Sequence, residues 1–137
     1  MLREDELSYR ERIIAEAKAD GLADGICKIV FYNREQVSWT PVSEEKLIDP
    51  YGVFPNESRG VVSGWISKAY NLLDKNYDVA DALFDCNAAR QRQDPEAIKK
   101  AEGKFHEIRN QFVSNNPGFS EELYDRAIQM GIRKVFR

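Results

Sequence analysis

The chain has 137 residues, of which 42% are hydrophobic and 31% are charged. This length is enough for one hydrophobic core. The apolar residues are too many for a disordered chain. They are also too interspersed with charged and polar residues for a membrane span. A net charge of −3 provides no basic surface for nucleic acid, so we expect no nucleic-acid partner. The charged opening MLREDELSYRER is unlike a signal sequence and favours a cytoplasmic protein with no membrane association.

The first predicted element is a helix over about residues 3–18, which is rich in helix formers and carries its apolar side chains close to one face. Gly21 is expected to cap its C-terminus. The next segments, ICKIVFY and QVSWTPV, are dense in β-branched and aromatic residues and are separated by residues 33–35. This pattern predicts an antiparallel β-hairpin over 26–42, in which Pro41 ends the second strand or places it at an edge.

The stretch IDPYGVFPNESRG, residues 48–60, connects the predicted hairpin to a helical second half. Pro50 and the residues after it favour a turn. Arg59 and Gly60 precede an expected helix that carries Trp65, so backbone amides and a guanidinium could together bind phosphate or carboxylate. The simpler interpretation, which motif frequencies favour, is a solvated arginine beside a turn glycine.

In the second half, a helix or a kinked pair is predicted over 61–91, with a break near residues 76–77. The next helix, over 94–113, has Asp94 as its cap and a proline at its first position. Ser120 and two glutamates begin another helix. The apolar stripe of the 94–113 helix, expected to lie in the core, consists of Ile98, Ala101, Phe105, Ile108 and Phe112.

These elements predict an α+β fold that is mainly helical, with a small antiparallel hairpin or sheet packed on a bundle of about four to five helices. A single domain over 1–137 is expected. Residues 1–60 supply a helix, the hairpin and the loop, and residues 61–137 supply the helical part.

No residue pattern in the chain is typical of a catalytic, cofactor or metal site. His106 is the only histidine and is expected at the surface. Cys27 and Cys86 form no CxxC pair and are expected to be buried, reduced thiols. Three aspartates could share a helix face and hold a cation, although a solvated acidic face is the simpler interpretation: Asp78, Asp81 and Asp85.

The order of helix, glycine-containing connection, strand KIVFYN, second strand, LIDPYGVFP and Arg-Gly resembles a segment near the C-terminus of bacterial SMC-like ATPases of the overcoming-lysogeny type, several of which belong to phage-defence systems. The resemblance covers about residues 7–66 and lacks the family's Trp-Pro pair and Gly-Phe-Phe cluster. No P-loop string occurs, so this chain alone cannot hydrolyse ATP. The resemblance implies a detached accessory or regulatory protein with an ATPase partner. The matching positions are Asp49, Tyr51, Gly52, Pro55 and Gly60.

Two function classes remain open. The first is a non-enzymatic protein-interaction or regulatory module of a bacterial or mobile-element system, acting on a protein partner or as a homodimer that pairs through the hairpin edge. The second is a small ligand-binding or enzymatic domain with a pocket between hairpin and helical bundle. The candidate interaction or anion-site residues are Arg59, Gly60, Trp65, Trp39 and Tyr51.

Overall fold

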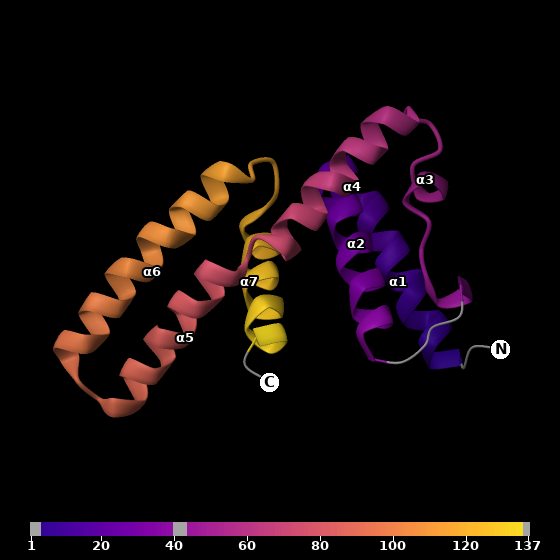
Figure 1. Cartoon of the computed structure of the whole chain (residues 1–137). Helices are drawn as coiled ribbons and strands as arrows, with labels where there is room; N and C mark the ends of the chain where they lie inside the picture. Colours follow the sequence, from indigo (N-terminus) through magenta and orange to yellow (C-terminus); the bar gives the residue numbers. More distant parts are fainter. Residues whose placement is uncertain (1–3, 40–43, 136–137) are drawn as a thin grey trace. The chain divides into compact units, whose positions relative to one another are not determined.

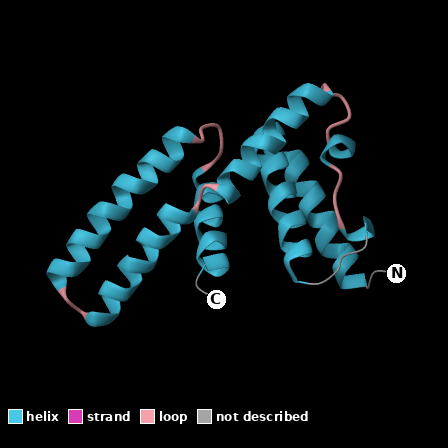
Figure 2. Ribbon diagram, in the orientation of Figure 1, coloured by secondary structure: helices cyan, strands magenta, loops and turns pink. Residues whose placement is uncertain are grey.

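The computed structural model of the chain describes residues 4–39 and 44–135. Over these ranges the backbone forms helices, turns and loops and no strand (Figure 2). The helices in chain order (Figure 1) are α1 (Glu4–Asp20), α2 (Leu22–Trp39), the 3-10 helix η1 (Glu44–Lys46), α3 (Pro50–Val53), α4 (Arg59–Asp74), α5 (Tyr77–Arg92), α6 (Pro95–Asn115) and α7 (Glu121–Val135). They divide into two compact units, residues 1–70 and 71–137, with the boundary inside α4.

The predicted β-hairpin is wrong, and with it the α+β fold class, because the single helix α2 occupies residues 22–39. Side chains at the consecutive positions 29–32 are all at most 3% exposed, whereas a half-buried strand would alternate between buried and exposed. A short apolar run fits a buried helix as well as a buried strand, and burial on several sides of α2 decides between them. Pro41 lies outside the described residues.

In the first unit, α1 packs along α2, and the two helices are joined at Gly21. The φ angle of Gly21 is +95°, a left-handed conformation that favours glycine, as expected for the cap of α1. Gly25 permits close packing, because a Cβ atom there would collide with the Ala17 carbonyl and the Phe54 ring. The shared core consists of Ile13, Ala17, Ile29, Tyr32, Ile48 and Val53, with Tyr9, Ile14 and Phe54 packed against it.

Two side chains of α2 hydrogen-bond to the backbone at the end of η1 and just after it. The Tyr32 hydroxyl donates to the Lys46 carbonyl at 2.6 Å. The Asn33 amide donates to the Ile48 carbonyl and accepts from the Ile48 N–H, both at 2.9 Å. Asn33, which the sequence suggested as part of a turn, therefore lies within a helix and satisfies the backbone of a neighbouring loop.

In the second unit, α5 and α6 form an antiparallel pair, and α7 packs against α5 (Figure 1). The predicted start of α6 is confirmed, since the Asp94 carboxylate accepts from the N–H groups of Glu96 and Ala97, and Pro95 stands at the first position. The predicted break near residues 76–77 and the helix after Ser120 are also confirmed. Buried side chains of this unit include Val79, Ala80, Ala82, Cys86, Ala89, Phe112, Leu123, Tyr124, Ala127 and Ile128.

Helix α7 is held in place by polar contacts and close packing. The buried Asn76 amide donates to the Ala127 carbonyl at 2.8 Å. A Cβ atom at Gly131 would lie 2.9 Å from Asn76 Cγ, so only glycine allows the helix to approach this closely. The α7 helix is thus positioned by a buried hydrogen bond as well as by apolar burial.

Arg109 joins α6 to the first turns of α7. Its guanidinium donates to Glu121 at 2.6 Å and to Asp125 at 2.9 Å. The hydrogen bond to Glu121, with smaller contributions from Asp125, raises the pKa of the Arg109 guanidinium.

The apolar stripe of α6 is only partly buried. Phe112 is buried, whereas Ile98, Phe105 and Ile108 are half-buried. The expectation that the whole stripe lies in the core holds at the Phe112 end, and toward Pro95 the stripe meets α5 with part of its surface exposed. No helix of the described part has both the length and the apolar character needed to cross a membrane.

Candidate functional site

The residues that the sequence proposed around position 50 form a helical turn rather than a simple β-turn. Asp49 caps the short helix α3, with its carboxylate accepting from the Tyr51 N–H at 3.0 Å, and Pro50 occupies the first position. This capping fixes the backbone that carries the Tyr51 ring.

Arg59 lies over Tyr51 at the start of α4. The Arg59 Cζ atom is 4.1 Å from the centroid of the ring, within cation–π distance. The Tyr51 hydroxyl and Ser63 Oγ share a hydrogen bond of 2.5 Å, which fixes the other end of the ring. The structure therefore brings together the two predicted residues and adds Ser63, which the sequence analysis missed.

The start of α4 is partly satisfied by the chain itself. Ser58 Oγ accepts a hydrogen bond from the Val61 N–H at 3.2 Å, which occupies one of the amides that an anion would need. Gly60 is exposed and its φ angle is not positive. The predicted anion site therefore competes with an existing cap and with the Arg59–Tyr51 contact.

The second stacked cation of α4 is Lys68, which lies over Trp65. The Lys68 Nζ atom is 4.3 Å from the centroid of the Trp65 ring, and Trp65 is half-buried. Trp65 lies six residues after Arg59, so the two residues occupy different sides of the helix. Trp39 is the last residue of α2, and its side chain lies outside the described part.

Four small residues separate the two stacked cations on the exposed surface of α4: Gly60, Ser63, Gly64 and Ser67. These four residues recur at spacings of three and four, which places them on one face of the helix. A Cβ atom at Gly60 or at Gly64 would meet nothing within 4 Å among the described residues, in contrast to Gly25 and Gly131, so packing within this part of the chain explains neither glycine. We define the α4 face as Gly60, Ser63, Gly64 and Ser67 with the flanking residues Arg59, Val61 and Lys68. The sequence signal for this face is the spacing in GVVSGWISK.

The remaining chemical candidates do not form a reactive centre among the described residues. His106 is exposed, with its ring centroid 5.8 Å from that of Phe105. No group of three or more His, Cys, Asp or Glu side chains in the described ranges could hold a metal ion, so the aspartates of α5 form no such cluster. Cys27 and Cys86 are buried thiols, and burial raises the pKa of Cys86.

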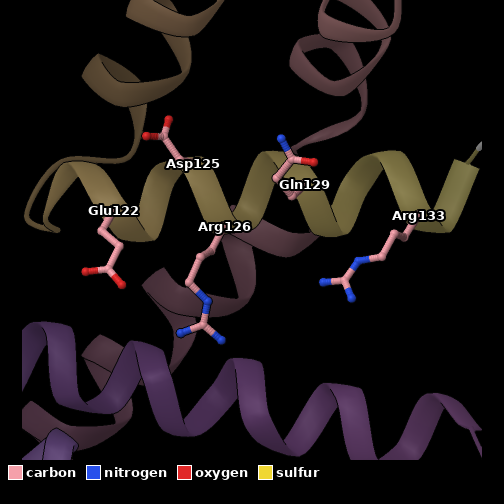
Figure 3. A pocket seen from close by; sticks show the side chains of 5 residues that line it. All are labelled: Glu122, Asp125, Arg126, Gln129 and Arg133. Atoms are coloured by element: carbon pink, nitrogen blue, oxygen red, sulfur yellow. The ribbon is translucent and has the colours of Figure 1, made fainter.

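A hollow of about 370 Å³ lies along α7. Figure 3 shows Glu122, Arg126 and Arg133 on one side of this helix and Asp125 and Gln129 on the other. Asp125 is already bound to Arg109 of α6. The hollow therefore has charges of both signs along one helix and no nucleophile paired with a base.

The chain matches no protein-family model, no curated protein and no solved structure. The resemblance to SMC-like ATPases accordingly stays a prediction from the sequence.

Proposed function

We propose that this chain is a non-enzymatic protein-interaction module that binds a partner protein through the α4 face. In a bacterial or mobile-element system it would regulate or assemble that partner, and the resemblance to SMC-like ATPases makes such an ATPase the first candidate. The alternative, a small ligand-binding or enzymatic domain, was expected to have its pocket between a hairpin and the helical bundle, and the described residues contain no hairpin.

The observation that carries the proposal is a strip of small exposed residues between two cations that are stacked on aromatic rings. Arginine and aromatic residues are enriched at protein interfaces. Stacking holds Arg59 and Lys68 in place before binding, so less side-chain entropy is lost when a partner docks.

The two glycines favour the same conclusion. A glycine inside a helix destabilises it by about 0.5–1 kcal/mol relative to alanine, and packing against the residues that the structure describes requires neither Gly60 nor Gly64. A glycine face lets another backbone approach closely, and Val61, which is 43% exposed, adds apolar area beside it. The flanking cations suit a partner segment with acidic residues.

The test uses two matched substitutions at helical glycines with open surroundings. Gly64→Gln places a long side chain on the α4 face, whereas Gly103→Gln makes the same change on α6. Both should leave the fold intact or stabilise it slightly, because glutamine is the better helix former. We expect a native-host protein to be captured by the original chain and by Gly103→Gln and lost with Gly64→Gln, with at least a tenfold weaker Kd for the purified partner.

Equal capture by all three proteins would rule out the α4 face. Light scattering distinguishes self-association: a dimer that Gly64→Gln converts to a monomer would identify a second copy of this chain as the partner.

A further inference from the structure

Helix α5 has one exposed side that carries aromatic rings. The helix packs against α6 and α7, and its buried residues are Val79, Ala80, Ala82, Cys86 and Ala89. By contrast, Tyr77 is 56% exposed and Phe84 is 41% exposed. These two residues are seven positions apart, about two helical turns, so they lie along the same side of α5. Packing within the second unit leaves much of this side open.

Four residues form a stripe along this side of the helix. We define the α5 stripe as Asp81, Phe84, Ala88 and Arg92. Successive members are three or four positions apart, which keeps them on one side of a helix. Asp81 and Ala88 are half-buried, and Arg92 is exposed. Tyr77, four residues before Asp81, extends the stripe toward the start of α5.

The charged residues at the two ends of the stripe are unpartnered in the part of the chain that the structure describes. Arg92 is the one arginine there that makes no hydrogen bond, ion pair or cation–π contact. Two positions earlier, Arg90 is bound to Glu102 of α6. Asp81 also makes no hydrogen bond or ion pair with a described residue. Both charges are therefore available to another molecule.

The stripe is complementary to a reversed copy of itself. From either end it presents a charged residue and then, three or four positions further in, an apolar residue. In an antiparallel pair of α5 helices related by a two-fold axis, Phe84 of one copy meets Ala88 of the other. Asp81 of one copy then faces Arg92 of the other, and the symmetry makes each contact occur twice.

The other charges of α5 favour the same antiparallel arrangement. The acidic residues of this helix all precede position 86, and its basic residues, Arg90 and Arg92, lie in the last turn. Two parallel copies would place like charges opposite each other, which opposes association. Two antiparallel copies place the acidic half of each helix beside the basic end of the other. The charge pattern therefore selects a second copy of this chain, in one orientation.

We propose that two copies of this chain associate through the α5 stripe, with their α5 helices antiparallel. Phe84 packs on Ala88 of the other copy, and Asp81 pairs with Arg92 of the other copy. One pair of 16-residue helices is a small contact beside the roughly 1,200–2,000 Å² buried in stable complexes, so we expect a dimer that dissociates in the micromolar range. This surface is distinct from the α4 face.

The experiment is sedimentation velocity of the full chain from low micromolar to near-millimolar concentration. We expect the mass to rise from that of a monomer to that of a dimer. Asp81→Arg and Arg92→Asp should each weaken association at least tenfold, because each substitution puts like charges opposite each other twice. The double variant Asp81→Arg with Arg92→Asp should restore it, since both ion pairs form again with reversed polarity. Lys99→Asp, at an exposed position on α6, should leave association unchanged.

Three results would overturn the proposal: a monomer at every concentration, a dimer that withstands both single charge reversals, or a double variant that stays as weak as the single ones. Circular dichroism of each variant shows that a loss of mass is not a loss of fold. The Gly64→Gln substitution on α4 should leave this dimer intact. Capture of a host partner does not depend on Asp81 or Arg92, so the failure of this inference and that of the interaction proposal are distinguishable.

Discussion

Tyr124 shows how one polar atom can hold a loop. Its ring is buried and packs edge-on against Phe112 and Phe119, with centroids 6.2 and 6.1 Å away. Its hydroxyl donates to the Asn116 carbonyl at 2.7 Å and accepts from the Phe119 N–H at 3.3 Å. One side chain thereby satisfies two backbone groups of the connection between α6 and α7.

We therefore expect Tyr124→Phe to lower the free energy of unfolding by about 1–2 kcal/mol, because the ring stays while two partly buried backbone groups lose their partner. Urea denaturation followed by circular dichroism measures this. The control is Tyr77→Phe, since Tyr77 is 56% exposed and should change stability by less than about 0.5 kcal/mol. Equal effects of the two substitutions would contradict the role assigned to Tyr124.

Cys86 should be unreactive in the folded chain. Burial raises the pKa of this thiol, and Arg90 acts in the opposite direction with a smaller effect. We expect slow labelling by a thiol reagent at pH 8 and fast labelling in guanidinium, because the thiolate is the reactive form. Since the folded pKa is the higher one, the stability that Cys86 contributes is present below the ordinary thiol pKa and is lost as pH rises through the folded value. Fast labelling of Cys86 under native conditions would show that it is accessible.

At the scale of elements, the connection between α5 and α6 combines one favourable and one unfavourable residue. Gln93 ends α5 with φ at +57°, a left-handed conformation that costs energy for any residue with a Cβ atom. Asp94 then caps α6 through the N–H groups of Glu96 and Ala97. Asp94 therefore stabilises this connection, whereas the left-handed conformation of Gln93 destabilises it.

Substitutions at Gln93 and Asp94 are expected to change the free energy of unfolding in opposite directions. Gln93→Gly should raise the free energy of unfolding by about 0.5–1 kcal/mol, because glycine adopts the left-handed conformation without steric cost. Asp94→Ala should lower it by about 1 kcal/mol through loss of the cap. Thermal melting of the two variants beside the original chain measures both. Stabilisation by Asp94→Ala would contradict the capping geometry.

At the scale of the whole molecule, the chain divides at residues 70 and 71. The hairpin edge that led us to expect a homodimer does not exist in the described residues, so self-association stays a prediction that now depends on the α4 face or the α5 stripe. Both tryptophans of the sequence, Trp39 and Trp65, belong to the first unit. Tryptophan fluorescence therefore follows that unit, whereas circular dichroism follows both.

Because fluorescence follows the first unit and circular dichroism follows both, the two methods should respond differently to Gly131→Ala. The added methyl group would collide with Asn76 and Ala80 in the second unit, at an expected cost of about 1–3 kcal/mol. The urea midpoint measured by circular dichroism should fall by more than the midpoint measured by fluorescence. Coincident midpoints that fall together would show that the two units unfold as one cooperative structure.

The candidate site was predictable in part. Arg59, Gly60 and Tyr51 could be named because arginine, glycine and aromatic residues stand close together in one loop. The stacking of Arg59 on Tyr51 could not be predicted, since it depends on the path from α3 to α4. A hollow lined by residues of α5 and α6 and by Lys75 between α4 and α5 could not be predicted either, because lining residues such as Lys75 and Asn115 are 40 positions apart in the chain.

The sequence by itself determined the helices of the second unit. Asp94 and Pro95 start α6, and Asn116, Pro117 and Gly118 follow its end, because capping and helix-breaking act within a few residues of backbone. Tertiary structure alone decided residues 22–39. Their β-branched and aromatic side chains favour a strand locally, by less than about 1 kcal/mol per residue. The helix buries the consecutive positions 29–32, of which a half-buried hairpin strand would expose every second one. This additional burial, about 1.5–3 kcal/mol for each large apolar side chain, outweighs the strand preference.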